Sequence, residues 1–378
     1  MAPTIQQLIR HGNPDPESVE ELLAESSFPL VEGPRVTFVF HGEADAVFLQ
    51  HWIYGLPSSQ AFTRLGSSEL WYLVLELPEK SRVEYKIDVV RDGEHEWMRD
   101  PLNPRLAHDP FGANSVCHSS GYMPPEWTMA DPEARPGTLD EIEVESAAFA
   151  SQRRVLLYLP ARFRRSRRYP LLIVHDGDDF LRFASLKVVL DNLIHRQEIA
   201  AMVVALAIPG ERLVEYGASE EHARFIIDEL LPDLEQELPL DERPATRGLM
   251  GASFGAVASL ATAWLHPGAF GNLFLHSGSF AFTDIGEQRR GPVFDPVVRF
   301  VNAFRERPGH PCQRIFMTCG IYESLIYENR SLFPLLQQTG VELKYVEARD
   351  GHNWENWRDR LREGLSWLYP GPLWMVYE

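Results

Sequence analysis

The stretch from residue 247 to residue 265 constrains the fold of this chain most, because it reads as a short apolar strand, a tight turn and a helix. Glycines stand two residues before and two residues after Ser253. Glycine at these places lets a strand and a helix pass closely without a clash between Cβ atoms. The spacing is typical of a nucleophile elbow, whose strained backbone holds a serine hydroxyl clear of the sheet edge. The sequence Gly-x-Ser-x-Gly also occurs in structural turns, so the flanking strand and helix are what favour a nucleophilic Ser253.

From residue 138 to residue 378, apolar stretches of strand length alternate with helical patterns. The strand-like stretches are 155–160, 171–176, 202–208, 272–276, 314–318 and 343–347. Continuous apolar strands between helices indicate a mostly parallel sheet covered by helices on both faces, the α/β class to which α/β-hydrolases belong. Ligands of such sheets bind outside the carboxyl ends of the strands. We therefore expect the functional residues in the loops that follow the strands.

Residues 1–130 follow a different pattern, because short stretches with a period of two are separated by turn residues. These stretches are 36–40, 46–49, 70–75 and 83–88. Several short strands at this spacing predict a small β-sandwich. The stretch 100–127 is rich in proline, glycine and asparagine but is not of low complexity, so we expect an irregular but ordered connector there, with the domain boundary at 131–137. Four aromatic residues fit either a binding face or the core of the sandwich: Trp52, Tyr54, Trp71 and Tyr85.

The composition excludes several classes of partner. A formal net charge of −18 argues against nucleic acid or an anionic membrane surface as a partner. We find neither an apolar run of the roughly 20 residues that a membrane helix needs nor a secretory signal pattern at the start. The three cysteines are scattered without the spacing of a zinc site or a disulfide framework. We expect a cytoplasmic protein without a metal or another cofactor, whose oligomeric state the sequence does not indicate.

A serine hydroxyl needs a base and an orienting carboxylate before it becomes a good nucleophile. In an α/β-hydrolase these residues follow the serine in the order acid, then histidine. His352 lies in the loop after the last predicted strand, where the base belongs. Glu323 is the first carboxylate after the preceding strand and is the predicted acid, with Glu328 and Asp350 as alternatives that are less well placed.

The negatively charged oxygen of an acyl-transfer intermediate needs two backbone donors. The amide of Phe254, directly after the serine, is one candidate. The other is the amide of Gly177 or Asp178, in the loop after the strand at 171–174. The aspartates of this loop also fit a metal site, which we consider a weaker interpretation. Arg212 follows a strand on the same side as the elbow and is a candidate substrate contact. His175 ends a strand near the elbow and is either a substrate contact in the pocket wall or a structural histidine.

The chain resembles the enterochelin (ferric enterobactin) esterase family, and its second half resembles α/β-hydrolases of the esterase-D type. The matching stretches are 100–104, 110–115, 169–177, 250–255, 277–280, 320–323, 351–352 and 357–358. The resemblance implies an N-terminal immunoglobulin-like domain, a serine hydrolase domain, and cleavage of carboxylic esters without a cofactor. It also implies that Ser253, Glu323 and His352 form the catalytic triad. The chain departs from the family pattern in having Asn353 after the base, where the family often has aspartate.

Three functions remain open at this stage. The first is a serine esterase similar to the enterochelin esterases, with a small-molecule ester as substrate. The second is an esterase for another ester, such as an acylated sugar or a phenolic ester. The third is a non-catalytic binding protein of the same fold, against which the complete set of Ser253, Glu323 and His352 argues.

Overall fold

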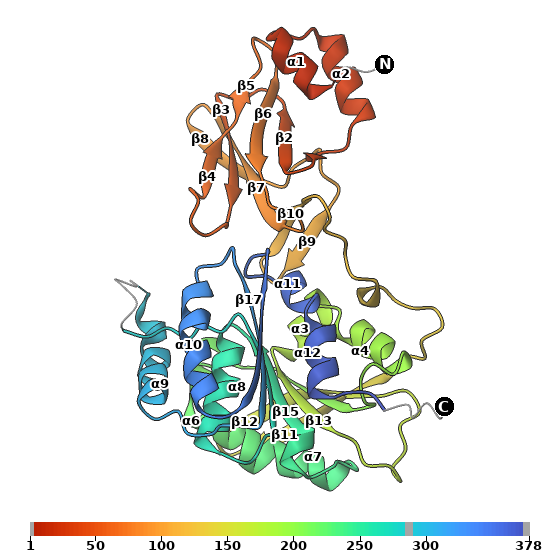
Figure 1. Ribbon diagram of the computed structural model, residues 1–378, viewed down its shortest axis with the longest axis vertical. Helices are drawn as coiled ribbons and strands as arrows, with labels where there is room; N and C mark the ends of the chain where they lie inside the picture. The colour runs from red at the N-terminus through yellow and green to blue at the C-terminus, as the bar shows by residue number, and fades with distance from the viewer. Residues whose placement is uncertain (1–3, 284–289, 373–378) are drawn as a thin grey trace. The chain divides into compact units, whose positions relative to one another are not determined.

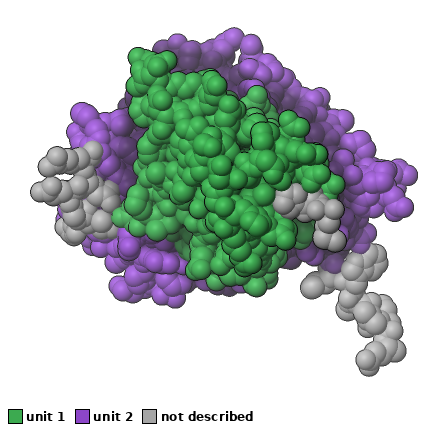
Figure 2. Space-filling view, turned by 90° about the horizontal axis from the view of Figure 1, so that it is seen from above, with its two compact units in different colours: residues 1–123, 321–323, 348–353 green, residues 124–320, 324–347, 354–378 purple. Residues whose placement is uncertain are grey.

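The computed structural model describes residues 4–283 and 290–372. The chain divides into two compact units, which Figure 2 shows in different colours. The N-terminal unit reaches residue 123 and also includes 321–323 and 348–353. The C-terminal unit comprises 124–320, 324–347 and 354–378. The division therefore comes before the boundary at 131–137 expected from the sequence, and two short segments from late in the chain group with its beginning.

Over residues 4–123, the N-terminal unit contains two helices and two antiparallel sheets (Figure 1). Its elements are α1 (Ile5–His11), α2 (Pro16–Glu25), β1 (Leu30–Glu32), β2 (Arg35–His41), β3 (Ala46–His51), β4 (Ser59–Ala61), β5 (Thr63–Arg64), β6 (Leu70–Glu76), β7 (Arg82–Arg91), β8 (Glu94–Met98), β9 (Leu106–Asp109) and β10 (Gly112–His118). The first sheet has the order β1-β2-β6-β5. The second has the order β4-β3-β7-β10-β9, with β8 paired to β7.

Both sheets of the N-terminal unit contribute to one hydrophobic core. Phe38 of β2 and Ile87 of β7 are completely buried in it, and so is Cys117 of β10. Tyr322, from one of the two late segments, packs into the same core. The expectation of an irregular connector over 100–127 was wrong in part, because β9 and β10 form a hairpin there and β10 pairs with β7. The two strands are short and flanked by proline and glycine, so their sequence showed no strand pattern.

One large sheet forms the centre of the C-terminal unit. Its strands are β11 (Thr138–Ser146), β12 (Ser151–Leu159), β13 (Leu171–His175), β14 (Val203–Ala207), β15 (Arg247–Ala252), β16 (Asn272–His276), β17 (Arg314–Gly320) and β18 (Glu342–Ala348). Their order is β11-β12-β14-β13-β15-β16-β17-β18. The strands from β14 to β17 pair in parallel, as expected from their apolar sequences. β11 and β12 are antiparallel, and the acidic β11 was not recognised in the sequence.

Helices cover both faces of this sheet (Figure 1). The helical elements of this unit are η1 (Glu126–Thr128), α3 (Gly177–Phe183), α4 (Leu186–His195), α5 (Arg212–Glu215), α6 (Glu220–Arg224), the π-helical turn η2 (Phe225–Leu230), α7 (Leu231–Glu237), η3 (Pro244–Thr246), α8 (Phe254–Leu265), η4 (Pro292–Phe294), α9 (Asp295–Glu306), α10 (Ile326–Gln338), α11 (Trp354–Arg358) and α12 (Leu361–Leu368). Leu171 and Ile173 of β13 pack with α7, α8, α9 and α10. The alternate residues Leu172 and Val174 pack with α3, α4 and α12. A strand that is apolar on both sides is thus buried on both sides.

The pairing of the strands determines where their loops lie. Because β13, β15, β16 and β17 run in parallel, their carboxyl ends lie at one edge of the sheet. The chain reaches Ser253 directly after β15 and the segment 321–323 directly after β17. Within the described residues, none of the helices has the length and apolarity needed to cross a membrane.

Candidate active site

Ser253 lies in a strained turn between β15 and α8. Its backbone has φ 57° and ψ −117°, a conformation that residues with a side chain rarely adopt and that often marks a functional site. The two glycines make the turn possible. A Cβ on Gly251 would lie 2.4 Å from the backbone of Gly255, and a Cβ on Gly255 would lie 3.1 Å from the Cβ of His175. The local geometry is therefore that of a nucleophile elbow.

The neighbouring strand fixes the position of this serine. The Ser253 amide donates to the carbonyl of His276, at the end of β16, over 2.9 Å. The Ser253 hydroxyl lies 3.0 Å from that of Ser279, whose amide donates to the Ser253 carbonyl over 3.2 Å. Ser279 belongs to one of the stretches that match the enterochelin esterases, but no role was predicted for it from the sequence.

Glu323 and His352 contact each other directly. Glu323 Oε2 lies 2.5 Å from His352 Nδ1. The side chain of Glu323 is 2% exposed and that of His352 is 35% exposed. A carboxylate oxygen accepts at this distance, so Nδ1 carries the hydrogen and Nε2 is the nitrogen that can take a proton. Both residues belong to the N-terminal unit, in the segments 321–323 and 348–353, whereas Ser253 belongs to the C-terminal unit.

The two alternative acids are bound elsewhere. Asp350 Oδ1 accepts from the Gly351 amide over 2.7 Å and from Asn353 Nδ2 over 2.8 Å, and it lies 3.3 Å from Arg82 Nη1. Burial raises the pKa of Asp350 to about 7, and the nearby Arg82 guanidinium opposes that shift. Glu328 is completely buried and pairs with Arg290 over 2.6 Å.

The candidate oxyanion loop follows β13, next to the elbow strand. Asp176 has φ 56° and precedes α3. Its carboxylate binds Arg212 through two hydrogen bonds, of 2.7 Å to Nε and 2.6 Å to Nη2. A Cβ on Gly177 would lie 2.3 Å from Leu206, so only glycine fits there. Arg212 was expected to contact substrate. In the structure its guanidinium holds this loop through Asp176, and its side chain remains 34% exposed.

The remaining predicted donors lie at helix starts. Gly177 and Asp178 open α3, and Phe254 opens α8. Amides in the first turn of a helix have no acceptor within that helix, so they are available to an oxyanion.

The aspartates of this loop were also considered as metal ligands. Burial, followed by the charges of Asp178 and Asp176, raises the pKa of Asp179 to about 6. In the part of the chain that the structure describes, no group of histidine, cysteine, aspartate or glutamate residues is arranged to hold a metal ion.

His175 occupies a different environment from the one expected of a substrate contact. It is completely buried, and burial lowers its pKa to about 4. Its Nδ1 lies 3.1 Å from the Met250 carbonyl, so Nδ1 donates and Nε2 accepts from His222 Nε2 over 2.9 Å. The expectation that His175 contacts substrate is therefore corrected, and its ring is a packed core group behind the elbow.

Comparison with known proteins identifies the family. Residues 146–368 match the family described as "Putative esterase". The chain belongs to this family. It is an esterase that acts on carboxylic esters, as expected from the elbow and the order of the candidate residues.

Similar proteins extend over both halves of this esterase. The iron(III) enterobactin esterase of Escherichia coli (strain K12) is 24% identical over 312 residues, which cover 78% of this chain and 73% of that protein. The enterobactin esterase of Shigella flexneri, solved in the presence of enterobactin, superposes with a TM-score of 0.70 at 21% identity, covering 88% of this chain and 92% of that one. A ferulic acid esterase of Anaeromyces mucronatus, in complex with ferulic acid, superposes with a TM-score of 0.52 at 16% identity, covering 65% and 95% of the two chains. These structures share the α/β-hydrolase-like fold.

Proposed function

We propose that this esterase uses Ser253 as its nucleophile, His352 as its base and Glu323 as the residue that orients the base. The contact of 2.5 Å between Glu323 and His352 is the observation that carries the proposal. It is supported by the strained elbow at Ser253 and by the chain order serine, acid, histidine. The same set of residues supports an enzyme over a non-catalytic binding protein.

The proposed reaction passes through an acyl-enzyme. His352 Nε2 takes the hydroxyl proton as Ser253 Oγ attacks the ester carbonyl carbon, and Glu323 stabilises the imidazolium that forms. The amides of Phe254 and of Gly177 or Asp178 stabilise the negative oxygen of the tetrahedral intermediate. His352 then gives the proton to the departing alkoxide. Water repeats these steps to release the acid, so the sequence of steps needs no cofactor.

A fluorophosphonate probe tests the identity of the nucleophile. We expect mass spectrometry to find the adduct on Ser253, and we expect Ser253→Ala to lose both labelling and hydrolysis of p-nitrophenyl acetate. Loss of a triad nucleophile reduces kcat by a factor on the order of 10⁶. Labelling that persists in Ser253→Ala would contradict the assignment.

We further propose that the N-terminal unit is an immunoglobulin-like β-sandwich that shapes the choice of substrate. In its loop after β3, Trp52 and Tyr54 are about half exposed. The Tyr54 amide donates to the Tyr322 carbonyl over 2.7 Å, so these aromatic side chains belong to a loop bonded to the residue before Glu323. Aromatic side chains offer stacking surfaces to an aromatic ester.

The proposed substrate is therefore a small-molecule ester with an aromatic acyl group. A catecholate ester of the enterobactin type is the first candidate, in line with the relatives that cleave enterobactin. A phenolic ester is the alternative, in line with the ferulic acid esterase. Hydrolysis of a catecholate trilactone, a feruloyl ester and an acylated sugar should be compared side by side, and a preference for the acylated sugar would refute the aromatic assignment. The cytoplasmic setting expected from the sequence remains part of the proposal, and the three buried free cysteines fit it.

A further inference from the structure

The backbone of β7 and the loop before it hold the two segments that carry Glu323 and His352. The Arg82 amide donates to the Arg349 carbonyl over 2.9 Å, and the Tyr322 amide donates to the Asp350 carbonyl over 3.1 Å. All of these residues belong to the N-terminal unit. The start of β7 and the two late segments therefore form one hydrogen-bonded layer, although Arg82 and Asp350 lie 268 positions apart in the sequence.

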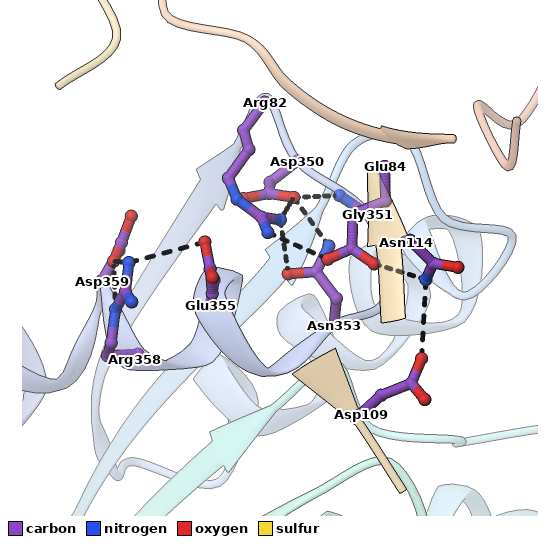
Figure 3. Close-up of polar contacts among 10 residues, drawn as sticks. All are labelled: Arg82, Glu84, Asp109, Asn114, Asp350, Gly351, Asn353, Glu355, Arg358 and Asp359. Atoms are coloured by element: carbon purple, nitrogen blue, oxygen red, sulfur yellow. Dashed lines mark hydrogen bonds and ion pairs between the residues drawn. The ribbon is translucent and has the colours of Figure 1, made fainter. Parts of the chain in front are cut away.

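The side chain of Arg82 contacts both ends of the loop 350–353, which carries His352 and is called the base loop below. Its Nη1 donates to Asp350 Oδ1 over 3.3 Å and to Asn353 Oδ1 over 3.0 Å, and these residues flank Gly351 and His352. Asn353 Nδ2 closes the ring by donating to Asp350 Oδ1 over 2.8 Å. Figure 3 shows the guanidinium directed toward Asp350 and Asn353. The loop that carries the base is thus held at the residues on both sides of it.

The buried charge of Arg82 needs several acceptors around it. Arg82 is completely buried, and a buried cation is tolerated only where acceptors surround it. Besides the base loop, its Nη2 donates to Glu84 over 3.0 Å, and Glu84 in turn accepts from Asn114 over 2.8 Å. The planar fork of arginine can bind these acceptors at once, whereas the ammonium of lysine acts as a point charge.

The residue before Arg82 holds the acid segment. Ser81 Oγ lies 2.5 Å from the Tyr322 hydroxyl, and Tyr322 immediately precedes Glu323. Ser81 itself is fixed, because its amide donates to Ser119 Oγ over 2.7 Å. The consecutive residues Ser81 and Arg82 therefore contact the two late segments, Ser81 the segment 321–323 that carries Glu323 and Arg82 the segment that carries His352.

We propose that Arg82 is a positioning residue of this esterase, which holds the loop 350–353 so that His352 Nδ1 meets Glu323. The proposal rests on the proposed function, in which His352 is the base. It assigns to the N-terminal unit a part in the chemistry in addition to the choice of substrate. Arg82 acts through the loop and does not touch the substrate.

The test compares Arg82→Met with Arg82→Lys and with Arg91→Met as a matched control. Arg91 ends the same strand and pairs with Glu96 at the surface, where its side chain is 45% exposed. Each variant is first checked by thermal melting, and kinetics are measured below its melting range. With p-nitrophenyl acetate we expect Arg82→Met to lower kcat by about tenfold to hundredfold with KM within a few-fold, because small displacements of a catalytic group cost this much. Arg82→Lys should recover part of the loss, and Arg91→Met should match the wild type.

A double-mutant cycle separates a specific contact from general destabilisation. In the Asp350→Ala background, Arg82→Met should cost clearly less in kcat than in the wild type, because the oxygen of residue 350 that accepts from Arg82 is already gone. Equal losses in the two backgrounds, or a folded Arg82→Met with wild-type kcat, would overturn the positioning role.

His352→Ala, measured alongside, distinguishes the two ways of failing. If His352→Ala is inactive while folded Arg82→Met is fully active, only the role of Arg82 is wrong. If His352→Ala retains full activity, the proposed triad is wrong, and the positioning role is wrong with it.

Discussion

Replacing Glu323 by glutamine separates the roles of Glu323 and Asp350. Glutamine keeps the size of the side chain at the position 2.5 Å from His352 Nδ1 but removes its charge. In the proposed triad of the wild type, the carboxylate accepts the Nδ1 hydrogen, and Nε2 acts as the base. A glutamine amide can donate to Nδ1 instead, and the ring hydrogen then occupies Nε2, where it prevents the uptake of a proton.

The size of the effect follows from the burial of the pair. Two opposite charges about 4 Å apart interact by about 4 kcal/mol at an effective dielectric constant near 20. The Glu323 side chain is 2% exposed, but that of His352 is 35% exposed, so the stabilisation of the imidazolium lies between about 1 kcal/mol, the value in bulk water, and about 4 kcal/mol, and we take about 3 kcal/mol. This energy corresponds to roughly a hundredfold loss in kcat, before any effect of the wrong tautomer.

Steady-state hydrolysis of p-nitrophenyl acetate by Glu323→Gln and Asp350→Asn is the assay. Both changes replace a carboxylate by an amide of nearly the same shape, so each serves as the control for the other. Asp350→Asn should lose less than about tenfold, because asparagine keeps an oxygen acceptor for Arg82 and for the Gly351 amide. Equal losses, or a larger loss in Asp350→Asn, would refute the assignment of Glu323 as the orienting acid.

Two further predictions concern stability and specificity. Burial raises the pKa of Asp350 to about 7, so the unfolded chain releases this proton from about pH 4 while the folded chain keeps it until about pH 7. The contribution of the Asp350 carboxyl to the free energy of unfolding is therefore fully present below about pH 4. It is lost between about pH 4 and pH 7, by an amount on the order of a few kcal/mol. Urea unfolding at pH 5 and pH 8 should show that Asp350→Asn, relative to the wild type, is more stable at the higher pH than at the lower; a pH-independent difference would contradict this. Trp52→Ala should lower kcat/KM for a bulky aromatic ester by about tenfold and leave p-nitrophenyl acetate within a few-fold, with thermal melting as the check on folding, and equal losses on both esters would argue against a substrate-shaping role.

Local patterns in the sequence were sufficient to predict the elements around the candidate active site. The turn at Ser253 was predicted because its two glycines are required within a few residues of the strained backbone. The parallel strands were predicted because burial on both faces makes each of them continuously apolar. The order of residues along the chain also favoured Glu323 over Asp350 as the partner of His352. The side chains of Glu323 and His352 are in contact.

Features that depend on distant partners were not predicted. Arg82 is one arginine in a strand of mixed character, and its contacts to Asp350 and Asn353 leave no trace in the local periodicity. The hairpin of β9 and β10 was hidden because its strands are short and lie among prolines and glycines. His175 looked like a residue at the open end of a strand, but His222 of α6 covers it, and a helix packing over a strand end is a tertiary effect.

The grouping of the acid and base segments with the N-terminal unit suggests how substrate choice and catalysis are connected. The loop with Trp52 and Tyr54 is bonded through its backbone to Tyr322, and Ser81 holds the hydroxyl of that same tyrosine. An aromatic ester that contacts this loop therefore binds to a segment that is hydrogen-bonded to the residue before Glu323. If Glu323 and His352 act as proposed, binding energy from parts of a substrate remote from the reacting bond can favour the arrangement of these two residues that the transition state needs. It follows that shortening the aromatic part of the substrate should reduce kcat as well as raise KM, whereas a rigid, independent binding surface would change KM alone.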